Sequence, residues 1–230
     1  MSIQENLSII QNHIKIAAEK AGRAEDDIIL LGATKTVSPS RIKEAVNAGL
    51  LHIGENRVQE FVEKYDHAQN ATWHFIGHLQ TNKVKYIVGK AALIHAVDSI
   101  KLLHVIEKQA EKLGVCADVL IEVNASGEES KFGVSFDAVR PMLEENEKNK
   151  HVHIRGLMTI GPHTKESNTV RNAFCNMRNL YENLAAEKFE HASMEYLSMG
   201  MSGDYMVAIE EGANIVRLGS AIFGNREWRE

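Results

Sequence analysis

Apolar side chains in the first twenty-one residues recur at intervals of three or four positions. They are Ile3, Leu7, Ile10, Ile14, Ala17 and Ala21. Side chains with this spacing form one stripe along an α-helix, and the following Gly22 is a typical helix end. The pattern therefore predicts an N-terminal helix with one buried face.

After Gly22 the pattern alternates between short apolar runs, which are typical of strands, and segments with helical spacing. The predicted strands are Ile28–Thr34, Leu51–Gly54, Thr72–Gly77, Leu93–Val97, Asp118–Asn124, His153–Ile160, Tyr196–Met199 and Ile215–Leu218. The predicted helices are Arg41–Ala48, Asn56–His67, Ser99–Leu113 and Glu166–Lys188. Asp98 is the expected cap of the helix that ends before Gly114, and Asn56 with Gln59 is a candidate capping pair.

This alternation favours an α/β fold with a parallel sheet. Eight strand–helix units with one extra N-terminal helix predict closure into a single (β/α)8 TIM barrel, for which ~250 residues is a usual size. No linker rich in Ser, Pro or Gly interrupts the chain. We therefore expect one domain over residues 1–230. The alternative is an open doubly wound sheet, but the even spacing shows no topological reversal.

Composition excludes several classes of protein. The chain has 230 residues, 44% hydrophobic and 25% charged, with a net charge of −5, so nucleic acid is not an expected partner. Cys116 and Cys175 show no metal-ligand spacing and are expected to be reduced thiols. The N-terminus lacks a signal-peptide pattern, and no apolar stretch is long enough for a membrane span. We expect a cytoplasmic protein that does not contact membranes.

Lys35 is the residue that most directly indicates chemistry. It follows the apolar run Ile28–Thr34, and Ser38 then Pro39 indicate the start of the next helix. Lys35 is therefore expected at the carboxyl end of an interior parallel strand, where α/β folds place ligand sites. A lysine amine at such a position is a nucleophile for an aldehyde.

Two loops near the carboxyl terminus have features of phosphate sites. The first leaves the seventh strand through Gly200 and Gly203 and is predicted to enter a helix at Ser202, its expected N-cap. The second leaves the eighth strand through Gly219 and Ser220. Backbone amides and helix N-termini at such glycines favour anions, and barrels often build phosphate sites from these two loops.

Closure of the barrel would make the first and eighth strands neighbours, which brings Lys35 close to Arg217. The Lys35 amine, the permanently charged Arg217 and the two phosphate-type loops would then lie at the same end of the barrel. Pyridoxal phosphate fits this set, with its aldehyde at Lys35, its ring nitrogen at Arg217 and its phosphate at Ser202, Gly219 and Ser220. Arg217 could instead be a structural cation paired with a carboxylate inside the barrel.

The chain resembles the pyridoxal phosphate homeostasis proteins over nearly its whole length. The matching stretches are Ala33–Val37, Gly54–Glu60, Trp73–Gln80, Lys131–Gly133, Gly156–Thr159, Leu197–Asp204 and Arg217–Gly219. The resemblance implies a barrel like the N-terminal domain of alanine racemase, with pyridoxal 5'-phosphate as a Schiff base on Lys35. It also implies that Asn56 and Met199 line the pocket.

Other side chains invite different interpretations. The 11 histidines, His78 among them, show no third ligand at zinc-like spacing, so we expect no metal site. Lys131 could be a second lysine that docks the cofactor transiently, although a solvated loop lysine is the simpler interpretation. Asn56 is explained equally well as a helix cap.

Three functions compete. The protein could bind the cofactor and hand it to apoenzymes without catalysis, could be an amino-acid racemase, or could form a Schiff base with a sugar-phosphate aldehyde. A racemase needs two placed acid–base groups, and Tyr205 is the nearest candidate for the second. An aldehyde enzyme would need carboxylates at other strand ends, such as Glu55 and Glu122. We expect the first, a non-catalytic cofactor-homeostasis protein, and, without a racemase's second domain, a monomer.

Overall fold

The computed structural model describes residues 1–128, 132–164 and 166–224. Within these ranges eight strands form a closed parallel barrel in sequential order. The strands are β1 (Ile29–Ala33), β2 (His52–Glu55), β3 (Thr72–Phe75), β4 (Leu93–Val97), β5 (Ala117–Glu122), β6 (Val152–Met158), β7 (Ala192–Ser198) and β8 (Ile215–Leu218). Strand β1 pairs with β8, and Leu31 lies beside Arg217. The predicted barrel closure is confirmed.

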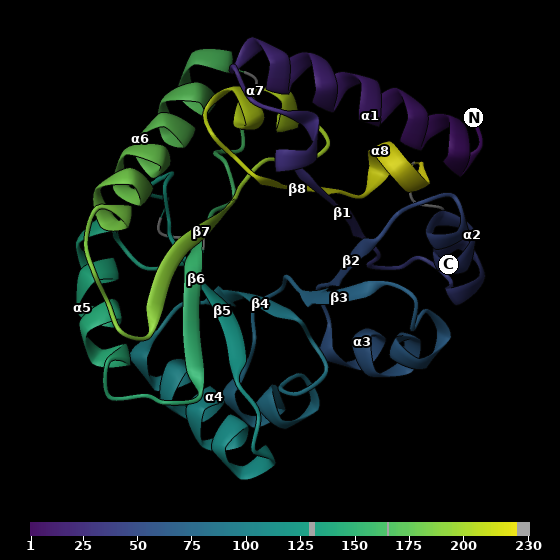
Figure 1. Ribbon diagram of the computed structural model, residues 1–230. Coiled ribbons are helices and arrows are strands. Elements are labelled where there is room, and N and C mark those ends of the chain that lie inside the picture. Colours follow the sequence, from purple (N-terminus) through teal and green to yellow (C-terminus); the bar gives the residue numbers. More distant parts are fainter. Residues whose placement is uncertain (129–131, 165, 225–230) are drawn as a thin grey trace.

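Helices surround the barrel (Figure 1). They are α1 (Ile3–Lys20), α2 (Pro39–Asn47), α3 (Val58–Lys64), α4 (Ile100–Leu113), α5 (Phe136–Asn146), α6 (Ser167–Ala185), α7 (Tyr205–Glu210) and α8 (Ser220–Phe223). Short 3-10 helices occupy η1 (Glu25–Asp27), η2 (Tyr65–His67) and η3 (Thr81–Tyr86). None of the helices in the described ranges is long and apolar enough to cross a membrane.

Helix α1 follows its predicted apolar stripe. Ile3, Leu7, Ile10 and Ile14 are all buried, and the helix lies along α7 and α8 (Figure 1). Its start is a capping box in which Ser2 Oγ accepts from the Glu5 amide at 3.2 Å and the Glu5 carboxylate accepts from the Ser2 amide at 2.7 Å. The extra N-terminal helix therefore covers the part of the barrel that the short last two helices leave open.

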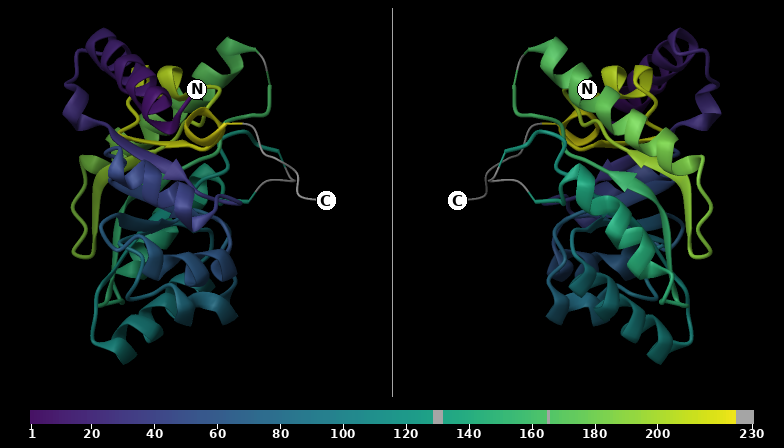
Figure 2. Two further views of the ribbon diagram at one scale, coloured as in Figure 1. Left: turned by 90° about the vertical axis from the view of Figure 1, so that its right-hand side faces the viewer. Right: turned by 90° about the vertical axis from the view of Figure 1, so that its left-hand side faces the viewer.

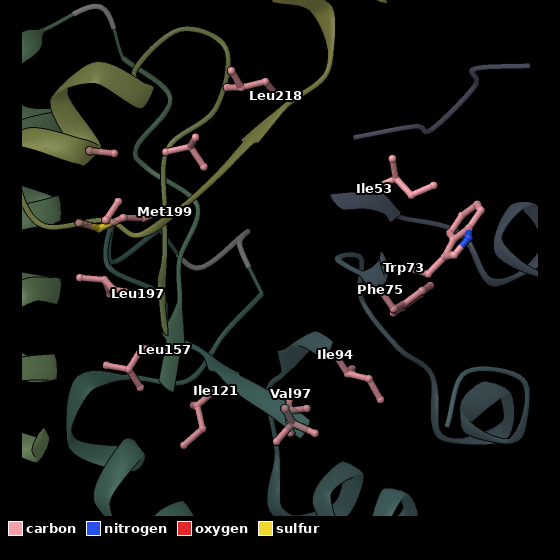
Figure 3. Close-up of a cluster of buried hydrophobic side chains, with 14 of the residues drawn as sticks. Ile53, Trp73, Phe75, Ile94, Val97, Ile121, Leu157, Leu197, Met199 and Leu218 are labelled. Carbon is pink, nitrogen blue, oxygen red and sulfur yellow. The ribbon is translucent and has the colours of Figure 1, made fainter. Parts of the chain in front are cut away.

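Two layers of buried hydrophobic side chains stabilise the barrel. Inside it, a small cluster is formed by side chains from several strands and from the residue that follows β3, among them Leu31, Ile76, Leu93, Leu120 and Met158. Outside it, the alternate strand residues pack beneath the helices (Figure 3). This alternation assigns every strand residue to the interior or to the helix layer.

Several predicted elements differ from the structure. No helix is predicted between the fifth and sixth strands, yet α5 forms there with Pro141 in its middle. Proline removes one helical hydrogen bond, but burial of Met142 and Leu143 offsets the loss. The segment between β3 and β4 forms only a 3-10 helix. Strand β7 begins at Ala192, earlier than predicted, because its half-buried polar start pairs with β6.

The expected helix caps were also partly wrong. Ser99, not Asp98, caps α4 by accepting from the Leu102 amide at 3.3 Å. The left-handed Gly114 ends that helix as predicted.

In the side view, the described residues that directly follow β5 and β6 lie on the same side of the barrel (Figure 2). This is the carboxyl edge of the strands, which carries the candidate site.

Candidate functional site

Lys35 lies in a tight turn between β1 and α2. The amide of Val37 donates to the Thr34 carbonyl at 2.9 Å, which closes the turn over Lys35 and Thr36. Pro39 is the first residue of α2, as predicted. The predicted place of Lys35 at the carboxyl end of an interior strand is therefore confirmed.

A cavity of about 390 Å³ opens at this edge of the barrel. Lys35, Ser202, Arg217, Gly219 and Ser220 all line it, although more than 160 residues separate the first from the others. The pairing of β1 with β8 brings the segment that follows β1 close to the loops that follow β7 and β8. Five of the seven predicted site residues thus share one cavity.

The lining also includes Arg41, which was not predicted. Arg41 lies in the first turn of α2 and donates from Nη2 to the Phe223 carbonyl at 2.7 Å. Its place next to the Ser38–Pro39 helix start is a signal that could have identified it. With Lys35 and Arg217 it makes three cationic side chains in the lining, and no acidic side chain of the described ranges lines the cavity. The charge suits an anionic ligand.

Ser202 joins the two predicted phosphate loops. Its Oγ accepts from the amides of Gly219 and Ala221, each at 3.3 Å. The prediction that Ser202 caps its own helix was wrong, because α7 begins at Tyr205 and Asp204 holds the N-cap position. Ser202 instead faces the first turn of α8. The cavity wall there presents a hydroxyl and backbone amides.

Arg217 is 6% exposed although it lines the cavity. Its Nη1 donates to Ser198 Oγ at 2.7 Å and its Nη2 to the Thr159 carbonyl at 2.8 Å. Burial lowers the pKa of Arg217 to about 10, while the nearby carboxylates of Glu122 and Asp204 act in the opposite direction. The guanidinium is therefore charged at neutral pH and oriented by neutral partners.

A chain of histidines continues from Ser198 through the barrel. His95 Nδ1 lies 3.1 Å from Ser198 Oγ, His74 Nδ1 lies 3.0 Å from His95 Nε2, and His52 Nδ1 lies 3.0 Å from His74 Nε2. Burial lowers the pKa of all three rings, that of His74 to about 3. The rings are neutral at neutral pH, so His74 and His95 can each donate to one neighbour and accept from the other. No group of three or more metal-ligating side chains occurs within the described ranges.

Asn56 and Met199, the other two predicted site residues, do not appear in the cavity lining. Helix α3 begins at Val58 without a side-chain cap, so the proposed capping pair is wrong, and Asn56 Oδ1 is buried without a partner in the described part of the chain. Met199 is fully buried beside Leu197 in the outer hydrophobic layer (Figure 3). Their contact with a cofactor stays a prediction.

Two of the remaining candidates, Glu122 and His78, lie at or just after the carboxyl ends of strands β5 and β3. Glu122 is buried at the end of β5, where desolvation, and secondarily the Asp98 carboxylate, raise its pKa to about 7. His78 stacks on Phe132 with ring centroids 4.3 Å apart and lies 3.0 Å from Asp98. Lys131, the candidate second docking lysine, lies outside the described residues.

Tyr205, the candidate second racemase residue, does not line this cavity. It is buried between α1 and α7, and its hydroxyl is 2.8 Å from His13 Nδ1. A neighbouring cavity, lined by residues of α1 and α7, includes Tyr205 instead. The tyrosine is therefore held by the extra N-terminal helix.

Comparison with known proteins agrees with this architecture. Residues 2–227 match the family described as alanine racemase, N-terminal domain. A relative from Aquifex aeolicus, named pyridoxal phosphate homeostasis protein, is 46% identical over 99% of this chain and 100% of its own length. The counterpart of the same name in Escherichia coli is 35% identical over 98% of this chain and 97% of its own.

Solved structures show the same fold. PipY of Synechococcus elongatus, in a structure with PLP bound, has a TM-score of 0.84 and 30% identity, covering 97% of this chain and 100% of that one. An alanine racemase from Clostridium difficile has a TM-score of 0.74 and 18% identity, covering 96% of this chain and 57% of that one. The chain belongs to the alanine racemase N-terminal domain family and, within it, to the pyridoxal phosphate homeostasis proteins.

Proposed function

We propose that this protein binds pyridoxal 5'-phosphate in the cavity at the barrel mouth and holds it covalently through Lys35. The observation that carries the proposal is the convergence of an amine, a buried guanidinium and a hydroxyl–amide cradle in one cavity. Its volume of about 390 Å³ is typical of small-ligand sites. Three cations without a carboxylate among the described lining residues match a ligand that carries a phosphate.

Each residue has a role that follows from its chemistry. Ser202, Gly219 and Ser220 would bind the phosphate through a hydroxyl and backbone amides. Arg217 can only donate hydrogen bonds, so it would face an unprotonated ring nitrogen. The cofactor supplies an aldehyde carbon. The Lys35 amine, in its unprotonated form, would be the nucleophile that adds to that carbon, with release of one water molecule.

We propose further that the protein stores the cofactor and delivers it to apoenzymes without catalysis. An arginine at the ring nitrogen leaves the ring a weaker electron sink than an aspartate would. Tyr205, which could have served as a second acid–base group, is bonded to His13 away from the cavity. The relatives named as homeostasis proteins support the same assignment. In this proposal residues 1–230 act as one barrel domain and as a monomer.

The first test is the visible absorption of the protein mixed with pyridoxal phosphate. We expect a band that borohydride bleaches, with a pyridoxyl adduct on Lys35 in peptide mass mapping. Lys35→Ala should lose the band and keep its circular dichroism. The exposed Lys43→Ala in α2 is the matched control and should keep both. A band and adduct that persist in Lys35→Ala would refute the assignment.

The absence of catalysis needs its own assay. Protein loaded with cofactor should leave the optical rotation of L-alanine unchanged during long incubation. Sustained racemisation would favour the racemase function. If no band forms with pyridoxal phosphate at all, Lys35 should be tested with sugar-phosphate aldehydes.

A further inference from the structure

Both peptide groups that flank Lys35 are bound by charged side chains of α3. Lys64 Nζ donates to the Thr34 carbonyl at 3.0 Å, on the peptide group that precedes Lys35. The Thr36 amide, on the peptide group that follows, donates to Glu60 Oε2 at 2.8 Å. Because the orientations of these two peptide groups define the backbone dihedral angles of Lys35, α3 sets the direction in which its side chain leaves the chain.

These contacts belong to a buried ionic cluster, here called the α3 clamp and defined as Glu55, Glu60 and Lys64. Lys64 Nζ lies 2.7 Å from both Glu55 Oε1 and Glu60 Oε2. The side chains of Lys64 and Glu55 are 6% and 0% exposed. Thr34 Oγ1 also donates to Glu55 Oε1 at 2.7 Å. The clamp therefore contacts the residues on both sides of Lys35.

Stability alone is a poor explanation for such a cluster. Buried ion pairs are often no more stable than apolar side chains of the same volume, because desolvation offsets their attraction. The Glu55 atom Oε2 is in addition buried without a partner within the described ranges. What the clamp does provide is a set of fixed donors and acceptors for the turn that contains Lys35.

The turn itself is strained. Thr36 has a φ of 64° and is the one non-glycine residue with positive φ in the described part of the chain. A β-branched side chain disfavours this conformation, which persists only where the surroundings impose it. Glu60 accepts the Thr36 amide with a charged oxygen, which is a strong hydrogen bond. Lys35 and Thr36 both line the cavity.

We propose that Glu55, Glu60 and Lys64 are positioning residues for the covalent binding of pyridoxal phosphate at Lys35. The clamp holds Thr36 in the left-handed conformation and thereby presents Lys35 to the cavity. Glu55 and Glu60 also belong to the stretch Gly54–Glu60, which supports the family resemblance and contributes no residue to the cavity lining. This inference rests on the proposed function, because it assumes that Lys35 forms the covalent bond.

The test compares Glu60→Ala with the exposed Glu63→Ala one turn along the same helix. Each purified variant is titrated with pyridoxal phosphate, and the visible band gives the equilibrium constant for the covalent bond. Strain at such a residue corresponds to roughly a tenfold change in an equilibrium constant. We therefore expect about tenfold weaker covalent binding in Glu60→Ala and unchanged binding in Glu63→Ala.

Rescue separates positioning from a general structural effect. Glycine adopts positive φ without strain, so Thr36→Gly in the Glu60→Ala background should restore most of the covalent binding. The thermal stability of each apoprotein is also measured. A variant that had only lost stability would not regain its binding constant when Thr36 is replaced by glycine. Binding in Glu60→Ala equal to that of Glu63→Ala, or a loss that Thr36→Gly leaves unchanged, would overturn the inference.

Two further arms keep the result interpretable. If the wild-type protein forms no adduct on Lys35, the proposed function fails before the clamp is tested. If Glu60→Ala does not fold, Glu60→Met replaces it, because the methionine side chain is of similar size but cannot accept a strong hydrogen bond from the Thr36 amide. Weaker binding that Thr36→Gly restores then supports the clamp, and wild-type binding in Glu60→Met refutes it.

Discussion

Glu122→Gln should change how the stability of the protein depends on pH. Glu122 is 4% exposed, and burial, with the Asp98 carboxylate, raises its pKa from 4.5 to about 7. Between these two values the folded state binds a proton that the unfolded state releases. Stability therefore falls as pH rises through this window. The difference between a pKa of 4.5 and one of about 7 corresponds to about 3 kcal/mol. The wild type loses this much of its free energy of unfolding as the pH rises through the window, whereas the glutamine variant, which has no carboxyl group here, does not.

The assay is urea denaturation of the wild type and of Glu122→Gln at pH 5 and at pH 8. We expect the free energy of unfolding of the variant, relative to the wild type, to increase by about 3 kcal/mol across this range, less the part already lost at pH 5. Glu111→Gln removes an exposed carboxylate from α4 and serves as the charge control. A constant difference between wild type and Glu122→Gln at both pH values would refute the reasoning.

Three other substitutions test the packing around the site. Met199→Ala should lower the free energy of unfolding by about 2–5 kcal/mol, because Met199 is fully buried; if Met199 only packs, the affinity for pyridoxal phosphate measured by titration should not change. Ser198→Ala leaves a buried donor of Arg217 without its acceptor and should cost about 1–3 kcal/mol in chemical denaturation. Gly200→Ala should reduce the melting temperature, because Gly200 has a φ of 92° and an added Cβ would lie 2.6 Å from Ala208 Cβ; an unchanged melting temperature would contradict this.

The sequence was a better guide to strands than to connections. The interior strands were located to within a few residues, because a parallel strand buried on both faces carries a nearly continuous apolar run. Helix α5 was missed because Pro141 argues locally against a helix, and only its packing on the barrel makes the helix favourable. The caps at Asn56, Asp98 and Ser202 were assigned wrongly, because several neighbouring polar residues could serve and the surrounding structure selects one.

The residues of the candidate site were also predicted only in part. Lys35, Arg217 and the two glycine loops could be identified locally, since strand ends, glycines and cations are visible in the order of residues, and the resemblance added Asn56 and Met199. The alternation of inward and outward side chains places Met199 in the outer hydrophobic layer. The sequence could not predict this placement, because it depends on the exact register of β7, which the sequence left uncertain. The helix start at Ser38–Pro39 indicated where Arg41 lies in the chain, but its contact with the Phe223 carbonyl depends on the packing of α2 against α8.

The order of residues by itself determined the alternating elements, the closed barrel and the amine that follows its first strand. These depend on local periodicity and on the side-chain chemistry of single positions. Tertiary structure alone decided that Glu60 and Lys64 bind both peptide groups around Lys35, and that a histidine chain supports Arg217. Such contacts join residues from different elements, and their geometry exists only once barrel closure has fixed the distances between them.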